Sequence, residues 1–167
     1  LMITDVTIVL SKTPQFNLSY QALQHYLEQH NTTPSLRCIS DAVIAIRNSK
    51  LPQPKNLGNA GSFFKNPIVD ANTVASLSNR FKDVPHYPVH HGEYKIPAAW
   101  LIEQAGFKGK RVADVGSHHQ QAVVIVNHAN ATGKDIAAFA QQIQQQVQSQ
   151  FSITLETEVN ILPLASA

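Results

Sequence analysis

The stretch Leu51-Pro52-Gln53-Pro54 constrains this chain most, because a helix cannot continue through it. Proline has no backbone N–H to donate and restricts the conformation of the residue before it, so two prolines this close end helical structure. Two helical patterns precede the stretch, and a glycine-rich segment follows it. We therefore expect the main division of the chain at this point.

The opening of the chain predicts a strand. Val6, Ile8 and Leu10 share one face of an apolar, β-branched run over residues 1–10. Because a natural chain rarely begins inside a strand, we interpret the sequence as a fragment whose absent part supplies the neighbours of that strand. The alternative interpretation is a natural edge strand behind a cloning remnant.

Two helices are predicted between this strand and the division. Ser19 is expected to cap a helix over residues 20–29, which the proline-containing segment 31–34 ends. Ser40 is expected to cap a second helix, which extends to Arg47.

Beyond the division, helices and strands are mixed. The patterns first predict a glycine-rich loop over 58–67, a helix over 72–81 and a loop over 82–93. A helix over 96–105 follows, which Gly106 ends, and then a strand over 122–126. The last predicted elements are a helix from a capping box at Thr132 to Gln148 and a strand in which Phe151, Ile153 and Leu155 alternate. Regular β-α-β alternation is absent. We therefore predict the α+β class, with a mixed sheet packed by amphipathic helices.

The composition excludes several classes of protein. Only 14% of the residues are charged, the formal net charge is +2, and Lys and Arg form no block, which argues against nucleic acid as a partner. A single cysteine, Cys38, excludes a disulfide framework and a cysteine-based zinc cluster. Since no apolar run is long enough to span a bilayer, we expect a soluble, cytoplasmic protein with no membrane partner.

The eight histidines do not predict a metal site. His90-His91 and His118-His119 are adjacent pairs, whose side chains generally point apart and seldom chelate one ion. His86 and His90 have the spacing of helical ligands, but Pro88 lies between them. We therefore expect no metal ligands.

Ser62 is the most suggestive candidate for chemistry. Gly58 and Gly61 precede it and allow positive φ or a close approach of the backbone to a ligand. Its context is not the Gly-x-Ser-x-Gly motif of hydrolases. A tight turn whose serine satisfies only backbone groups is one alternative, and an anion-binding nest beside Lys65 and Asn66 is another.

Lysines and glutamates give weaker signals. Single lysines are usually solvated, but several that converge on a loop would suit a diphosphate, and four lie near proline- or glycine-rich loops: Lys50, Lys55, Lys65 and Lys95. Glu156 and Glu158 are expected to face outward at the end of a strand. The residues by themselves thus indicate an α+β domain with one suggestive loop.

A resemblance to a known family begins with the run GNAGSFFKNP over residues 58–67, preceded by KLPQPK over 50–55. Together these runs resemble the central motif of the MurB family, the UDP-N-acetylenolpyruvoylglucosamine reductases of bacterial cell-wall synthesis. The likeness continues through Tyr87-Pro88, KIPAAWLIEQAG over 95–106, HHQQA over 118–122 and LETEV over 155–159. It concerns the C-terminal half of the family only.

The resemblance implies three parts. Residues 1–51 would be the C-terminal remnant of the flavin-binding region, 52–152 the UDP-sugar-binding domain, and 153–167 a strand that returns toward the flavin domain. FAD and NADPH would serve the full-length enzyme, a monomer of the bacterial cytoplasm. We expect neither cofactor to be bound to this fragment, because the N-terminal flavin domain is absent from it.

The resemblance also implies roles for particular residues. Ser62 matches the general acid of the family and Glu158 its acidic partner. Seven positions match residues that contact the UDP-sugar: Tyr20, Arg47, Lys50, Asn66, Tyr87, Lys95 and Gln121. One departure is Thr157, where relatives often carry proline, and it bears on the placement of Glu158.

The chemistry of the family accounts for these residue types. Reduced flavin delivers a hydride to the enolpyruvyl group of UDP-N-acetylglucosamine enolpyruvate, and carbanion character develops beside the carboxylate. Ser62 would protonate that carbon, while Glu158 and cationic groups would stabilise the intermediate. The resemblance therefore implies part of an NADPH-dependent UDP-N-acetylmuramate dehydrogenase. A non-catalytic UDP-sugar-binding module and an unrelated α+β interaction domain are the alternatives.

Overall fold

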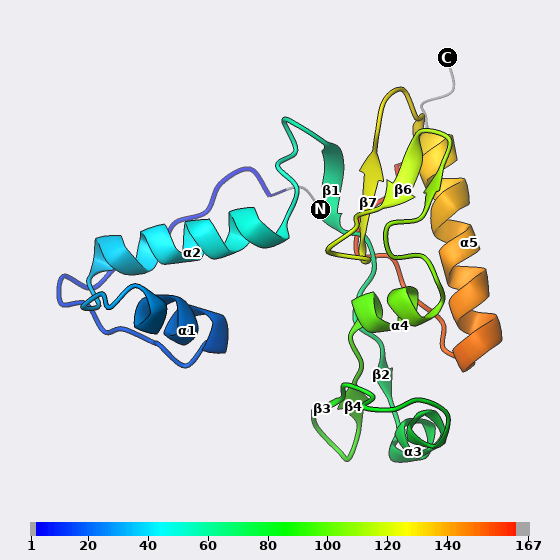
Figure 1. Cartoon of the computed structure of the whole chain (residues 1–167), viewed down its shortest axis with the longest axis horizontal. Coiled ribbons are helices and arrows are strands. Elements are labelled where there is room, and N and C mark those ends of the chain that lie inside the picture. The colour runs from blue at the N-terminus through cyan, green and yellow to red at the C-terminus, as the bar shows by residue number, and fades with distance from the viewer. Residues whose placement is uncertain (1–2, 163–167) are drawn as a thin grey trace. The chain divides into compact units, whose positions relative to one another are not determined.

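The computed structural model describes residues 3–162. Its described residues form two compact units, which divide between Ser49 and Lys50 (Figure 1). The assignment of residues 1–51, 52–152 and 153–167 to three functional parts stays a prediction, and residues 163–167 of the last part lie outside the described residues.

The first unit contains two helices, α1 (Gln21–Gln29) and α2 (Leu36–Lys50). Both predicted caps are wrong. Tyr20 occupies the N-cap position of α1, and the Ser19 hydroxyl instead donates to Asn17 Oδ1 at 2.7 Å. Helix α2 begins well before Ser40, because the hydroxyl of Ser35, directly after a proline, accepts the backbone N–H of Cys38 at 3.2 Å.

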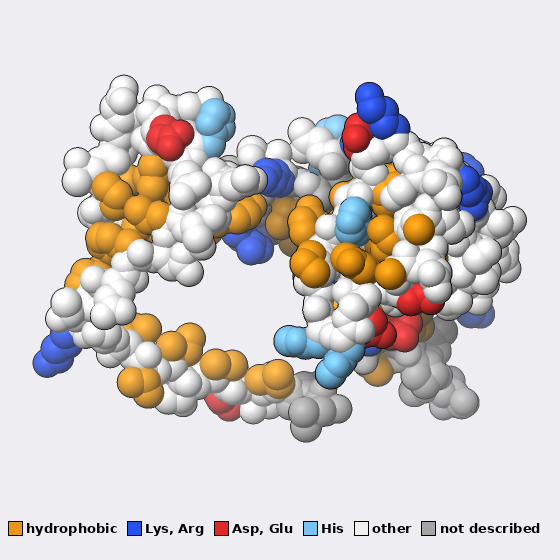
Figure 2. Space-filling view, turned by 90° about the horizontal axis from the view of Figure 1, so that it is seen from below, with side chains coloured by type: hydrophobic (Ala, Val, Ile, Leu, Met, Phe, Trp, Pro, Cys, Tyr) orange, Lys and Arg blue, Asp and Glu red, His pale blue; other side chains and the backbone are white. Residues whose placement is uncertain are grey.

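The predicted N-terminal strand is also absent from the described residues 3–10. Their apolar side chains stand in solvent, with Val6 73% exposed and Val9 95% exposed (Figure 2). A strand needs a partner for its backbone N–H and C=O groups, and no described segment pairs with these residues. The alternation of apolar side chains in this segment is therefore not enough to form a strand.

The second unit is built on a four-stranded antiparallel sheet. Its strand order is β1-β7-β6-β5, with β1 at Gly58–Ser62, β7 at Val124–Asn127, β6 at Val115–Ser117 and β5 at Arg111–Val112. Helix α5 (Gly133–Phe151) packs along β6 and β7 (Figure 1). The strand expected over 122–126 is confirmed as β7, whereas β5 and β6 carry no sequence pattern long enough to predict them.

The first half of the glycine-rich segment is the strand β1, not part of the predicted loop over 58–67, whereas residues 63–67 carry only an isolated bridge at Phe64. β1 pairs with β7, and its register shifts between Asn59 and Ser62. Gly61 adopts φ +75° at this bulge, and its N–H donates to Asn59 Oδ1 at 3.0 Å. Glycines weaken a strand locally but permit a bulge, and the pairing with a buried β7 overrides the loop-like composition.

A smaller antiparallel sheet has the order β2-β4-β3, formed by Ile68–Val69, Tyr94–Lys95 and Tyr87–Pro88. Helix α3 (Ala71–Arg80) follows β2, close to the predicted range of 72–81. Asp70 caps it by accepting the backbone N–H of Thr73 at 2.7 Å. Hydrogen bonds from the side chain and from the backbone of Thr73 lower the pKa of this carboxyl.

The core of the second unit lies between the large sheet, α4 (Ala98–Gln104) and α5. Leu101, Ile102, Ile143 and Val147 are fully buried. Both helices were predicted, including the end of α4 at Gly106, with φ +79°, and the capping box at Thr132. Among the helices within residues 3–162, none has the length and apolar character needed to cross a bilayer.

The predicted strand around Phe151 is wrong. Phe151 is the last residue of α5, and Ser152 ends the helix with φ +59°. Ile153 and Leu155 are buried, at 4% and 0% exposed, but their extended segment forms no strand. Their alternation therefore reflects burial on one side of a core-filling segment.

Candidate functional site

The segment after β1 lies between two distant parts of the chain. Phe63 N–H donates to the carbonyl of Val123, and Glu158 N–H donates to the carbonyl of Phe63, both at 2.9 Å. A further bond of 2.9 Å joins Lys65 N–H to the carbonyl of Glu156, around a bridge between Phe64 and Thr157. Glu158 is thus opposite Phe63, the residue that follows Ser62.

Buried aromatic side chains anchor this segment. Phe63 and Phe64 are 5% and 2% exposed, and their ring centroids lie 5.2 Å apart in an edge-to-face arrangement. Ser62 is exposed, directly between this anchor and the bulge at Gly61. The sheet therefore holds the backbone of Ser62 firmly while its hydroxyl remains accessible.

Glu156 and Glu158 differ in their partners. The carboxylate of Glu156 pairs with the Lys65 ammonium at 3.1 Å, with both side chains more than half exposed. The exposed carboxylate of Glu158 forms no ion pair with the residues that the structure describes. Of the two glutamates, Glu158 therefore keeps its charge available for a ligand.

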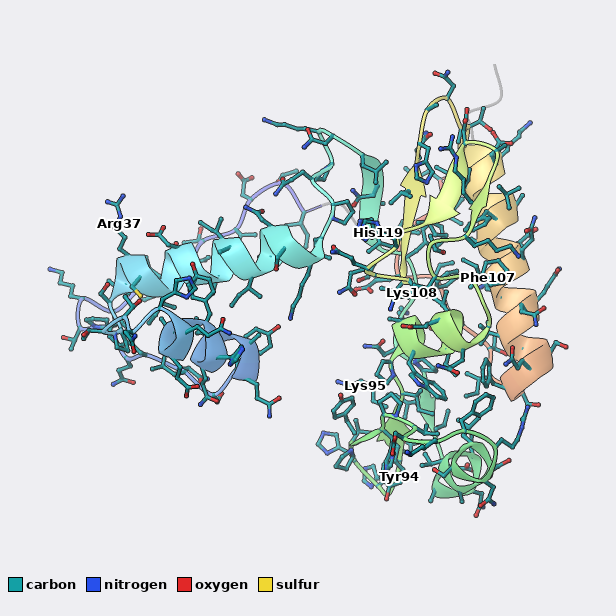
Figure 3. The ribbon with its side chains drawn as sticks, viewed as in Figure 1. Arg37, Tyr94, Lys95, Phe107, Lys108 and His119 are labelled. Carbon is teal, nitrogen blue, oxygen red and sulfur yellow. The ribbon has the colours of Figure 1, made fainter. Side chains whose placement is uncertain are left out.

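Three further predicted site residues lie in or next to the small sheet and α4: Asn66, Lys95 and Tyr87. Asn66 Oδ1 accepts the backbone N–H of Ala98 at 2.9 Å, so Asn66 caps α4 and keeps its amide N–H₂ as a donor. In the small sheet, Lys95, which is labelled in Figure 3, is registered with both Ile68 and Tyr87. Lys95 and Tyr87 are exposed, so both polar side chains are accessible at paired positions of adjacent strands.

Gln121 lies in the turn between β6 and β7. Its carbonyl accepts the N–H of Val124 at 2.9 Å, and Val124 is the registered partner of Ser62 in β1. Its own N–H donates to Nδ1 of His118 at 3.3 Å. The structure therefore brings Gln121 to the same end of the sheet as Ser62.

Sequence reasoning treated His118 only as half of an adjacent pair unsuited to metal. The structure buries it, at 6% exposed, beside the Gln121 backbone. Burial lowers the pKa of His118, and the neighbouring His119 lowers it further. The only signal in the sequence that points to His118 is the HHQQA run over residues 118–122, which resembles the family. Among residues 3–162, no group of three or more His, Cys, Asp or Glu side chains is arranged for a metal ion.

The remaining predicted site residues are not in the large sheet. Tyr20 and Arg47 belong to the first unit, where both side chains are exposed. Lys50 is the last residue of α2 and the first residue of the second unit. Their participation in the site stays a prediction.

A comparison with known families decides the identity of this arrangement. Residues 53–162 match the family described as UDP-N-acetylenolpyruvoylglucosamine reductase, C-terminal domain. The chain belongs to the UDP-N-acetylenolpyruvoylglucosamine reductase (MurB) family. The match spans all of β1 to α5 and continues beyond Glu158, so the α+β fold and the resemblance of the central motif are confirmed.

Individual relatives agree with this assignment. A UDP-N-acetylenolpyruvoylglucosamine reductase of Porphyromonas gingivalis is 48% identical over 149 residues, which cover 89% of this chain and 44% of the relative. Those of Amoebophilus asiaticus and Flavobacterium johnsoniae are 49% and 47% identical, and each match covers 96% of this chain and 48% of the relative. The chain thus spans about half the length of the curated relatives it matches.

The family implies FAD and NADPH in the full enzyme. Within its described part, the first unit buries three apolar side chains, Leu23, Leu27 and Ala42. In the second unit, the polar side chains of Ser62, Asn66, Tyr87 and Lys95 are exposed.

Proposed function

We propose that this chain is the substrate-binding half of an NADPH-dependent flavoenzyme that converts UDP-N-acetylglucosamine enolpyruvate to UDP-N-acetylmuramate. This reaction supplies the bacterial cytoplasm with a precursor of peptidoglycan. The observation that carries the proposal is the position of Ser62 and Glu158 on either side of Phe63, inside the domain that matches the family. The flavin and NADPH would be bound largely by the half that this chain does not cover, and they would supply the hydride.

Within this proposal, Ser62 donates a proton to the substrate carbon that carries carbanion character. A serine hydroxyl is a weak acid, but a carbanion is a strong enough base to accept its proton. Glu158 stabilises the enolic form of the intermediate from the neighbouring backbone position. The firm anchoring of Phe63 and Phe64 supports this role, because a proton donor must stay at a fixed distance from its acceptor.

The UDP-sugar is proposed to lie across the exposed polar groups of the second unit. Lys95 and the Asn66 amide would face the diphosphate, with Tyr87 and Gln121 beside them. Tyr20, Arg47 and Lys50 are proposed as further residues that contact the UDP-sugar in the whole enzyme. Ammonium-to-phosphate contacts are charge-assisted hydrogen bonds, the strong class of such bonds.

Titration of the chain with UDP-N-acetylglucosamine tests the binding part of this proposal. We expect amide resonances of residues 62–66, 95 and 121 to shift in an NMR experiment. Lys95→Ala should weaken binding by about tenfold to a hundredfold, because a charge-assisted hydrogen bond contributes roughly 1.5–3 kcal/mol. Lys134→Ala is the control, since Lys134 is exposed at the start of α5. Unchanged resonances near Ser62 would contradict the proposal.

A non-catalytic UDP-sugar-binding module is the second candidate, because the chain spans about half of its relatives. The visible flavin band distinguishes the two candidates. A complete polypeptide that contains this chain should be yellow when purified if it is a reductase, and colourless if it is only a binding module.

A further inference from the structure

His118 is one of two polar side chains, with Ser117, that are buried within the described part of the chain. It begins the turn between β6 and β7, where its backbone N–H donates to the carbonyl of Val124 at 2.9 Å. Its neighbour His119 is exposed in the same turn (Figure 3), with the two ring centroids 4.4 Å apart. His119 is the titratable group whose charge acts on His118.

The hydrogen bonds of the His118 ring define its tautomer. Nδ1 faces the backbone N–H groups of Gln120 and Gln121, at 3.4 and 3.3 Å. A backbone N–H can only donate, so Nδ1 must accept and carries no proton, while the neutral ring holds its proton on Nε2. A proton on Nδ1 would make Nδ1 a donor that faces the N–H donors of Gln120 and Gln121, and both hydrogen bonds would be lost.

We propose that His118 is a positioning residue whose unprotonated Nδ1 holds the turn that presents Gln121 to the substrate. The inference rests on the proposed function, in which Gln121 contacts the UDP-sugar. The turn is fixed at both ends, because Gln121 donates to the His118 ring and accepts from Val124. Since Val124 is registered with Ser62, the same bonds set the position of Gln121 relative to the proton donor.

The stereochemistry of the contact supplies a matched pair of variants. Asparagine has its Oδ1 the same number of bonds from the backbone as histidine Nδ1, and it commonly accepts N–H groups two or three residues ahead. His118→Asn therefore preserves the hydrogen-bond acceptor, whereas His118→Leu replaces it with an apolar side chain that cannot accept a hydrogen bond. His119→Leu is the control, since the His119 side chain is exposed and accepts no such bond in the described turn.

The test combines a structural and a functional measurement on this chain. Imidazole ¹⁵N shifts should show an unprotonated Nδ1 at His118, and the amides of Gln120 and Gln121 should exchange slowly with solvent. His118→Leu should lose this protection and bind UDP-N-acetylglucosamine roughly tenfold more weakly, as expected for two neutral hydrogen bonds. His118→Asn and His119→Leu should retain the protection and bind within about threefold of the unchanged chain.

Three results would overturn the inference. The first is a protonated Nδ1 at His118, and the second is an equal loss of protection from amide exchange in His118→Asn and His118→Leu. The third is unchanged affinity for UDP-N-acetylglucosamine in a His118→Leu chain whose turn has lost that protection. If His118→Leu does not fold, the tautomer of His118 and the amide exchange of the His118→Asn variant still test whether an unprotonated acceptor holds the turn. Failure of the unchanged chain to bind the nucleotide sugar would contradict the proposed function instead, while the shift and exchange data would still report whether His118 holds the turn.

Discussion

At the residue scale, Gly61 connects a backbone requirement to the placement of Ser62. Its φ of +75° lies in the left-handed region, and nothing lies within 4 Å of the position a Cβ would take. Gly61→Ala should therefore strain the backbone without a steric clash, at a cost of about 1–2 kcal/mol in the free energy of unfolding. Urea denaturation measures this cost.

Gly133→Ala is the matched control. Gly133 also has open space at its Cβ position, but it lies in α5 without positive φ. Alanine favours a helix, so this change should leave stability unaltered or raise it by roughly 0.5–1 kcal/mol. Equal effects of the two substitutions would mean that conformational strain at Gly61 is unimportant.

Ser62 is the second residue whose role can be isolated. In a complete reductase that carries this chain, Ser62→Ala should leave reduction of the flavin by NADPH nearly unchanged. Reoxidation of the flavin by the enolpyruvyl substrate should slow by at least about 100-fold, because general acid catalysis typically contributes that much. Stopped-flow absorbance separates the two half-reactions. Ser62→Cys should recover part of the second one, and equal slowing of both would assign Ser62 a merely structural role.

At the scale of elements, α5 depends on its N-terminal cap. The Thr132 hydroxyl oxygen accepts the N–H of Asp135 at 3.3 Å, and Asp135 Oδ2 accepts the backbone N–H of Thr132 at 2.8 Å. Thr132→Ala should destabilise the chain by about 1 kcal/mol, the usual effect of removing such a cap. Thr132→Ser keeps the hydroxyl and should cost much less. Thermal unfolding of both variants provides the comparison, and equal losses would argue that the methyl group matters more than the cap.

The helices of the second unit were predictable because their signals are local. A capping box, a glycine after the last turn and apolar residues at helical spacing all lie within one helix and its flanks. They located α5 and the end of α4 at Gly106. The two cap errors in the first unit are also local, since a serine before a helical pattern competes with its neighbours for the N-cap position.

At the scale of the whole molecule, the chain spans about half the length of the curated relatives it matches. We expect the purified chain to contain no flavin, because its first unit buries only three side chains within the described residues. The absorbance spectrum of the purified chain, before and after incubation with FAD, measures this directly. Stoichiometric FAD that survives gel filtration would contradict the prediction and would mean that the flavin site lies largely in this half.

The sequence by itself determined the family, the α+β class and the helices of the second unit, since motifs and helical periodicity are written in neighbouring residues. Only the tertiary structure decided that the glycine-rich segment is the bulged strand β1, because its partner β7 lies some sixty residues away in the register Ser62 to Val124. The same holds for the contact of Glu158 with Phe63 and for the buried ring of His118. Strand pairing and burial depend on which distant segments meet, and no local pattern encodes that meeting.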